Sequence, residues 1–478
     1  MISPPDNRSY TPIHTLNDDA LLNIFYIYQL IYGDISLYPD WDNARWWYKL
    51  TQVCRRWRYL ILASPVRLGL HLVCTYGTPV AEMLAHSPPF PLIINFLDNA
   101  RVVSTEDEGA ILFALQCRDR VRRIGLSMPA LGLVKVIKAM DGQFPVLERL
   151  FIWPWTRDYV DLMLPKTFQA PHLVMLSLSY AALSTGSPLL TTTIGLTLLA
   201  LWDIPLSAYF HPSNLVAQLS SLPLLENISI GFKSPIPAHD VEEQPFHTFI
   251  GMLVALPNLR MLFIRSVSAY LDGLLARIST PLLEVLQIRL FNQLSFTATH
   301  LFQFISRTEC IRFSFARLTF SREVVTLAAD RQEGDVFNPF DVEVGCRHID
   351  WQVSIAAQIF NGLMPVLSVV EGLALRYEEH DPSSERSNET SRTQWRDILR
   401  PFNNVKVLYV AGELIGDVSC ALQLEDGELP LELVPELKEL VYYQDGDPSN
   451  AFTSFTNARQ IAGCPVFLIN LPSPPTEL

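Results

Sequence analysis

The densest group of side chains that could bind a metal is the run Glu378, Glu379, His380 and Asp381. Carboxylate oxygens and an imidazole nitrogen are suitable zinc ligands, but a metal site also needs ligands that are held in one geometry. This run opens residues 378–396, a segment rich in Ser, Thr, Glu and Arg, and such a composition predicts an exposed loop. We therefore expect a solvated loop here and no bound metal.

The sequence motifs that mark nucleotide-binding and hydrolytic sites are missing. There is no glycine-rich phosphate loop, no G-x-S-x-G nucleophile elbow and no His-Glu-x-x-His zinc motif, and the ten histidines are dispersed. We expect a non-catalytic protein without a cofactor. The alternative is an enzyme with an unrecognised pocket, which would show titratable groups with shifted pKa values in a cavity.

The composition indicates a large hydrophobic core. Of the 478 residues, 49% are hydrophobic and 18% are charged, and the length suggests about three domains. The net charge of −13 argues against nucleic acid as the main partner. Seven scattered cysteines without a Cys-x-x-Cys pair, and an N-terminus without a signal-peptide pattern, predict a cytoplasmic or nuclear protein with reduced thiols.

One stretch raises the question of a membrane helix. Residues 173–202 carry no charged side chain, but Pro188 and the threonines that follow it interrupt the apolar run. The remaining apolar part is shorter than the ~20 residues that a membrane span needs. We expect a buried strand with its connection, and no contact with a membrane.

Two segments near the N-terminus have helical patterns. In residues 50–64 the apolar side chains fall on one helical face, and Arg55, Arg56 and Arg58 fall on faces where they can remain in water. Residues 20–31 are apolar nearly all round, so this helix must be covered on two sides. We expect the second helix to provide one cover, and more of the chain or a partner to provide the other.

The ends of these two helices carry further signals. Asp18 or Asp19 is expected to cap the first helix. Residues 32–47 are expected to form a loop that contains Trp41, Trp46 and Trp47. These tryptophans either cover the core or serve as aromatic anchors at an interface, and the sequence does not decide between the two.

The same segments resemble an F-box. The matching residues are Leu16, Asp19 to Leu22, Ile24 and Phe25, followed by Val-Cys-Arg-Arg-Trp-Arg at residues 53–58. Asn17 stands where the family has Pro, and the segment between the two halves is longer than in the compact form. The resemblance implies binding to a Skp1-type adaptor, and through it to a cullin. The residues that it assigns to adaptor binding are Leu16, Leu21, Leu22, Ile24, Phe25, Leu50, Val53, Cys54 and Trp57.

A different pattern, Pro-x-Leu-x-x-Leu-x-Ile, repeats along the rest of the chain. Full matches begin at Pro145, Pro171, Pro223, Pro257, Pro281 and Pro435, and versions without Pro begin at Val121, Leu196, Cys310, Val370 and Val405. The spacing suits a strand plus a connecting helix, stacked as a solenoid with the spaced apolar residues pointing inward. The repeat lacks the regular Asn of well-formed leucine-rich repeats, so we expect a degenerate version.

The predicted class is α/β: a small N-terminal all-α F-box module followed by an irregular leucine-rich-repeat-like α/β solenoid with a parallel sheet. The expected order is a flexible N-terminus (1–15), the F-box-like module (16–64), a connecting segment and N-terminal cap (65–118), the solenoid (119–470, with irregular insertions at about 318–364 and 378–396) and a tail (471–478). Inside it we expect strands at 341–346 and 465–469 and helices at 213–219, 246–256, 350–363 and 451–461.

Phrases at residues 63–68, 75–80, 348–352 and 451–455 resemble fungal, basidiomycete-type F-box proteins with degenerate leucine-rich repeats. This resemblance implies the substrate-recognition subunit of a Skp1–cullin–F-box ubiquitin ligase, whose solenoid binds an unknown target protein. The alternative is an interaction scaffold that does not enter a cullin complex. Candidates for target contacts are the out-facing strand residues Glu148, Arg149, Phe151, Arg260 and Arg289.

Overall fold

The computed structural model describes residues 13–32, 46–98, 100–155, 161–183, 187–236, 253–292, 299–308, 313–331, 339–378, 392–424, 431–443 and 450–471. The chain forms two compact units, Met1–Leu173 and Val174–Leu478, each of which is described by itself. Glu379, His380, Asp381 and Trp41, which the sequence singled out, lie outside the described residues.

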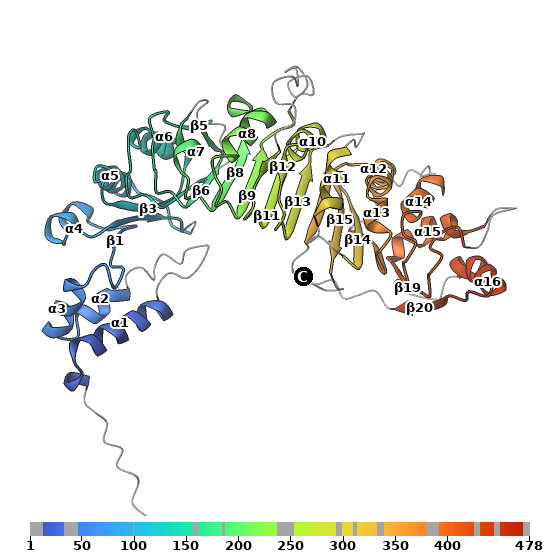
Figure 1. Ribbon diagram of the computed structural model, residues 1–478, viewed down its shortest axis with the longest axis horizontal. Coiled ribbons are helices and arrows are strands. Elements are labelled where there is room, and N and C mark those ends of the chain that lie inside the picture. The colour runs from blue at the N-terminus through green and yellow to red at the C-terminus, as the bar shows by residue number, and fades with distance from the viewer. Residues whose placement is uncertain are drawn as a thin grey trace, which may run out of the picture. The chain divides into compact units, whose positions relative to one another are not determined.

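The first unit begins with helices and continues with a parallel sheet (Figure 1). Its helical module consists of η1 (Ile13–Thr15), α1 (Asp18–Tyr32), α2 (Trp46–Thr51) and α3 (Arg55–Ala63). Strands β1 (Leu72–Cys74), β2 (Leu92–Phe96), β3 (Val121–Met128) and β4 (Arg149–Pro154) then pair in chain order, all parallel. The unit also contains α4 (Val80–His86), α5 (Thr105–Ala114), α6 (Ala130–Ala139) and β5 (Leu162–Leu164). The strand-and-helix alternation thus starts at β1, within the expected connecting segment.

The second unit continues the same alternation. Its sheet has the order β6 (Met175–Ser179), β8 (Leu198–Ile204), β9 (Asn227–Phe232), β11 (Met261–Ser266), β13 (Val285–Leu290), β16 (Phe340–Gly345), β15 (Val324–Asp330), β14 (Phe315–Ser321), β17 (Gly372–Glu378), β18 (Val407–Val410), β19 (Glu439–Tyr443) and β20 (Phe467–Leu471). Short strands are β7 (Ala181–Leu183), β10 (Val254–Ala255) and β12 (Ile278–Ser279).

Helical segments connect most of these strands and lie along one face of the sheet (Figure 1). They are α7 (Leu189–Thr192), η3 (Leu206–Ala208), α8 (Pro212–Leu219), α10 (Ser268–Leu275), α11 (Thr299–Arg307), α12 (Ile349–Gly362), α13 (Met364–Leu367), α14 (Arg392–Leu399), η5 (Gly412–Leu414), α15 (Ile415–Leu422), η6 (Asn450–Phe452) and α16 (Thr453–Ile461). In the described part of the chain, no helix is both long and apolar enough to cross a membrane.

The repeated apolar pattern forms the buried side of the sheet. Leu262 of β11 lies opposite Ile228 and Leu286 in the neighbouring strands, and Ile264 continues the ladder two residues on. These side chains are almost fully buried. Successive side chains of a strand point to opposite faces, so residues two apart stack in layers against the helices. The expected α/β repeat class with a long, mostly parallel sheet is confirmed.

The sheet is not parallel throughout, which corrects one expectation. The segment expected to be an irregular insertion contributes three strands, and β15 runs antiparallel to both β14 and β16. Only two residues separate β14 from β15, and so short a connection can join antiparallel strands only. The expected strand and helix of this segment are present as β16 and α12.

Two further local predictions were wrong. Residues 392–396, expected in an exposed loop, belong to α14, because its Trp395 and Arg396 are buried against the rest of the unit. Residues 246–256 were expected to be helical, but Val254 and Ala255 form β10, which pairs with β12 in a short parallel ladder. The remainder of that expected helix lies almost entirely outside the described residues. The helices expected at 213–219 and 451–461 are observed as α8 and α16.

Charged residues gather on the sheet face opposite the core at β14 to β16. The Asp330 carboxylate is fully buried and accepts a hydrogen bond from Arg317 at 3.3 Å, and Glu343 pairs with Arg289 at 3.2 Å. Asp341 lies among these groups. The pKa of Asp341 is raised to about 6, chiefly by burial and also by the carboxylates of Glu343 and Asp330, while Arg289 opposes the rise.

Replacing this carboxyl by an amide, Asp341→Asn, should stabilise the protein at neutral pH. The pKa of Asp341 is higher in the folded state than in the unfolded state, so its contribution to stability is full at low pH and is lost as the pH rises from about 4 to 6. The variant should therefore gain about 1–2 kcal/mol at pH 7.5 and little at pH 4. Urea unfolding of both proteins at the two pH values measures this, and an equal gain at both would contradict the assignment.

Candidate functional site

Helix α1 begins at a side-chain cap. The Asn17 Oδ1 accepts a hydrogen bond from the Ala20 amide at 2.8 Å, and Asp18 and Asp19 occupy the first turn, where negative charge favours the helix dipole. The expectation that an aspartate caps this helix was wrong, because Asn17 lies at the capping position. This is the residue at which the sequence departs from the F-box pattern, and the departure supplies a good helix start.

One side of α1 belongs to the core of the helical module. Leu21, Leu22 and Phe25 are buried, and the Phe25 ring contacts the Trp57 ring edge-on with centroids 4.8 Å apart. Trp57 lies on α3 and is only partly buried. The prediction that α1 is covered on one side by the second helical segment is confirmed.

That second segment is two helices where one was predicted. Helix α2 ends at Thr51 and α3 begins at Arg55, with Cys54 in an extended conformation between them. The Cys54 Sγ accepts a hydrogen bond from the Trp57 amide at 3.4 Å and so caps α3. The apolar spacing continues across the break, so periodicity alone did not reveal the turn. Val53 consequently points into solvent.

Two of the arginines expected in water join the helices to one another. The Arg56 guanidinium donates to the Asp18 carboxylate and to the Leu16 carbonyl, both at 2.6 Å. Arg58 donates to the Thr51 carbonyl at the end of α2, at 3.0 Å. Half-exposed ion pairs stabilise a fold only slightly, so we assign these contacts to orientation of the helices.

Of the three tryptophans singled out between residues 41 and 47, the two that the structure describes are core residues. Trp46 and Trp47 are buried, the Trp47 Nε1 donates to the His71 carbonyl at 3.3 Å, and its ring lies 5.9 Å from that of Phe90. Of the two roles that the sequence left open, these two side chains therefore cover the core and do not serve as anchors at an interface. Trp47 thus joins the helical module to residues beside the first strands of its unit, and Trp46 lies 6.1 Å from the Tyr28 ring of α1, within the module.

The other side of α1 exposes an isoleucine stripe, Ile24, Ile27 and Ile31. Their side chains are 41%, 54% and 63% exposed, and their spacing of three and four residues places them on one face of the helix. Tyr26 and Leu30, beside the stripe, are also exposed. Isolated apolar residues on a surface need no explanation, but a contiguous apolar face on an ordered helix marks an interaction surface.

The residues predicted to bind an adaptor therefore fall into three groups. Leu21, Leu22 and Phe25 are buried; Leu16, Leu50 and Trp57 are partly exposed; Ile24, Val53 and Cys54 are exposed. Four further apolar or aromatic residues that the F-box pattern did not single out are exposed: Ile27, Leu30 and Ile31 on α1, and Tyr59 on α3. The apolar character of α1 on all sides was the signal for the missed residues of that helix.

His71, directly before β1, is held neutral by its surroundings. Its exposed fraction is only 9%, and its Nε2 accepts a hydrogen bond from the Arg122 guanidinium at 3.1 Å. Burial, together with the positive charges of Arg123 and Arg122, lowers the pKa of His71 to about 3.

This histidine should make the first unit sensitive to acid. The folded pKa of His71 lies below its unfolded value of 6.5, so the unfolded state binds more protons and stability falls as the pH drops from 6.5 toward 3. Between pH 7.5 and pH 5 the loss should be about 2 kcal/mol. His71→Gln keeps an acceptor for Arg122 but cannot become charged. Urea unfolding at both pH values should show a smaller loss for the variant; equal losses would contradict this role for His71.

Little else in the described residues resembles a chemical site. No group of three or more His, Cys, Asp or Glu side chains within them is arranged to hold a metal ion. Of the out-facing residues proposed for target contacts, Arg260 and Arg289 are exposed; Arg260 pairs with Glu284, directly before β13, and Arg289 pairs with Glu343 of β16. Phe151 does not present a surface, because it is buried despite its out-facing position.

Comparisons with known proteins give matches among solved structures alone. No protein-family model and no curated protein matches the chain. A chain of the Rad7–Elc1 complex from yeast is similar over 90% of this chain and 88% of its own length, with 12% identity and a TM-score of 0.29. The leucine-rich repeat-containing protein LegL7 from Legionella pneumophila is similar over 82% of this chain and 98% of its own, with 13% identity and a TM-score of 0.27.

Proposed function

We propose that this protein is a receptor subunit of a Skp1–cullin–F-box ubiquitin ligase. Its helical module binds the Skp1-type adaptor through the isoleucine stripe, and its repeat solenoid holds a target protein. The observation that carries the proposal is that α1 has two apolar faces. One face buries Leu21, Leu22 and Phe25 in the module, and the other leaves Ile24, Ile27 and Ile31 exposed to solvent. A helix of this kind is folded before it meets a partner and offers that partner an apolar face.

In this role the protein acts by proximity. It holds the target close to a ubiquitin-charged enzyme, which raises the effective concentration of the two reactants, and none of its own residues takes part in a covalent step. The adaptor and the cullin work in the cytoplasm and the nucleus, so we place the protein in these compartments. The free cysteines of the described residues, Cys54, Cys74, Cys117, Cys346, Cys420 and Cys464, are compatible with a reducing environment.

Affinity purification of the full chain, with immunoblotting for the adaptor and for the cullin, tests the proposal. Both partners should be retained, and both should be lost from a chain that lacks residues 1–64. Retention of the adaptor without the cullin would favour the interaction scaffold, because an F-box can bind an adaptor outside a ligase. Retention of neither partner by the full chain would contradict both functions.

A further inference from the structure

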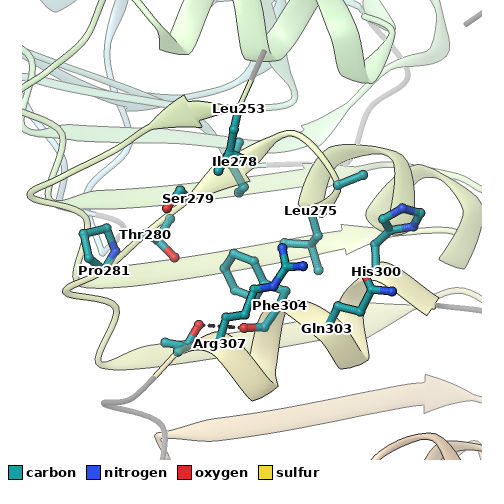
Figure 2. Close-up of a pocket in the computed structure, with 12 residues that line it drawn as sticks. Leu253, Leu275, Ile278, Ser279, Thr280, Pro281, His300, Gln303, Phe304 and Arg307 are labelled. Atoms are coloured by element: carbon teal, nitrogen blue, oxygen red, sulfur yellow. Dashed lines mark hydrogen bonds between the residues drawn. The ribbon is translucent and has the colours of Figure 1, made fainter. Parts of the chain in front are cut away.

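A pocket of about 170 Å³ lies within the second unit, far along the chain from the helical module (Figure 2). Leu275 at the end of α10, Ile278 of β12 and Phe304 of α11 line it. All three side chains are buried. The floor of the pocket is therefore apolar and belongs to the packed core of the unit.

One polar atom of the pocket is buried without a hydrogen-bond partner. Thr280, directly after β12, is 4% exposed, and among the described residues nothing pairs with its Oγ1. The hydroxyl of Thr308, also in the pocket lining, donates to the Phe304 carbonyl at 2.8 Å. A buried hydroxyl without a partner costs about 1–3 kcal/mol, so such groups in native proteins commonly have a ligand or water as partner.

The pocket is also lined by an exposed arginine, and no carboxylate of the lining pairs with it. Arg307, at the end of α11, reaches back along its helix toward Leu275, as Figure 2 shows. Within the part of the chain that the structure describes, Arg307 has no ion pair, and no Asp or Glu lines the pocket. His300 is different, because its Nδ1 lies 2.9 Å from the Asp272 carboxylate, which also accepts from the His300 and Leu301 amides.

We propose that this pocket binds a carboxylate that carries a short, branched apolar chain. The Arg307 guanidinium pairs with the carboxylate, the Thr280 hydroxyl donates to it, and the apolar chain lies against Leu275, Ile278 and Phe304. A neutral ligand would gain no charge-assisted hydrogen bond from the exposed Arg307, and an inorganic anion would gain nothing from the apolar floor. Two sources present this chemistry: a free short-chain carboxylic acid, or the C-terminal valine or leucine of a peptide.

Isovalerate, titrated into the full chain with ¹³C-labelled isoleucine methyl groups, tests the proposal. The methyl resonance of Ile278 should shift and saturate at millimolar isovalerate, and neutral isovaleramide should bind at least about five-fold more weakly because it lacks the charge for Arg307. Arg307→Gln should weaken isovalerate binding to a similar extent. Thr280→Val, which keeps the branched shape and removes the hydroxyl, should weaken it by about two-fold or more.

Lys138→Gln is the matched control, because Lys138 is an exposed cation near the end of α6, in the other unit, and should leave binding unchanged. An unshifted Ile278 resonance, or equal binding of isovalerate and isovaleramide, would overturn the proposal. The peptide Gly-Gly-Val with a free C-terminus, tested against its C-terminal amide, then separates the two sources. Competition by the free peptide alone assigns the site to peptide C-termini; no competition by either assigns it to free carboxylic acids.

Discussion

Ile27→Asp combined with Ile31→Asp should reduce adaptor binding by at least about 100-fold while the helical module remains folded. Both side chains are more than half exposed, so the change removes little packing within the protein. In the proposed complex the same positions lie in a desolvated apolar interface, where two unpaired carboxylates cost well over the ~2.7 kcal/mol that a 100-fold change requires. Titration calorimetry with purified Skp1-type adaptor measures the loss, and circular dichroism checks the helices.

A matched control separates this effect from the added charge. Leu131→Asp combined with Ile461→Asp also places two aspartates at highly exposed apolar positions, one on α6 and one at the end of α16. This variant should bind the adaptor like the wild type. If the stripe variant binds as tightly as this control, the isoleucine stripe is not the adaptor surface, whatever else the helical module does.

The sequence predicted the repeat strands well because their pattern is set by burial. In β11 and β13 the inward side chains are leucine and isoleucine at every second position, and the register stacks them in the core. Alternation of this kind is typical of a strand with one face in the core. Strand β15 escaped prediction because its residues do not fit the repeat pattern and were expected to belong to an irregular insertion; its antiparallel direction leaves no trace in periodicity either.

The candidate site was less predictable for a related reason. Helix α1 is apolar nearly all round, so no polar face sets which residues point inward and which point out. The choice between Phe25 and Ile27 is made by the position of α3, whose Trp57 packs on Phe25. The position of α3 depends in turn on the break at Cys54 and on the contacts of Arg56 with α1. These contacts join residues far apart in the sequence, so residue spacing does not reveal them.

Phe25→Ala should abolish adaptor binding by a different route, through unfolding of the helical module. Phe25 is 1% exposed and its ring packs edge-on against Trp57, so truncation removes a buried aromatic contact and leaves a cavity between α1 and α3. Core changes of this kind cost about 3–5 kcal/mol, which is comparable to the whole stability of a small helical domain. Hydrogen exchange of the α1 amides should accelerate by two orders of magnitude or more.

Comparison with two other variants makes this result diagnostic. Tyr26→Ala, next in sequence but exposed, should change α1 exchange little, and the double aspartate variant should leave it near the wild-type rate. The expected outcome is loss of binding with loss of protection for Phe25→Ala, and loss of binding with retained protection for the stripe variant. Wild-type protection in Phe25→Ala would mean that Phe25 is dispensable for packing. Because Phe25 and Ile27 lie about half a helical turn apart on α1, this contrast assigns the core and the contact surface of the helix to opposite faces.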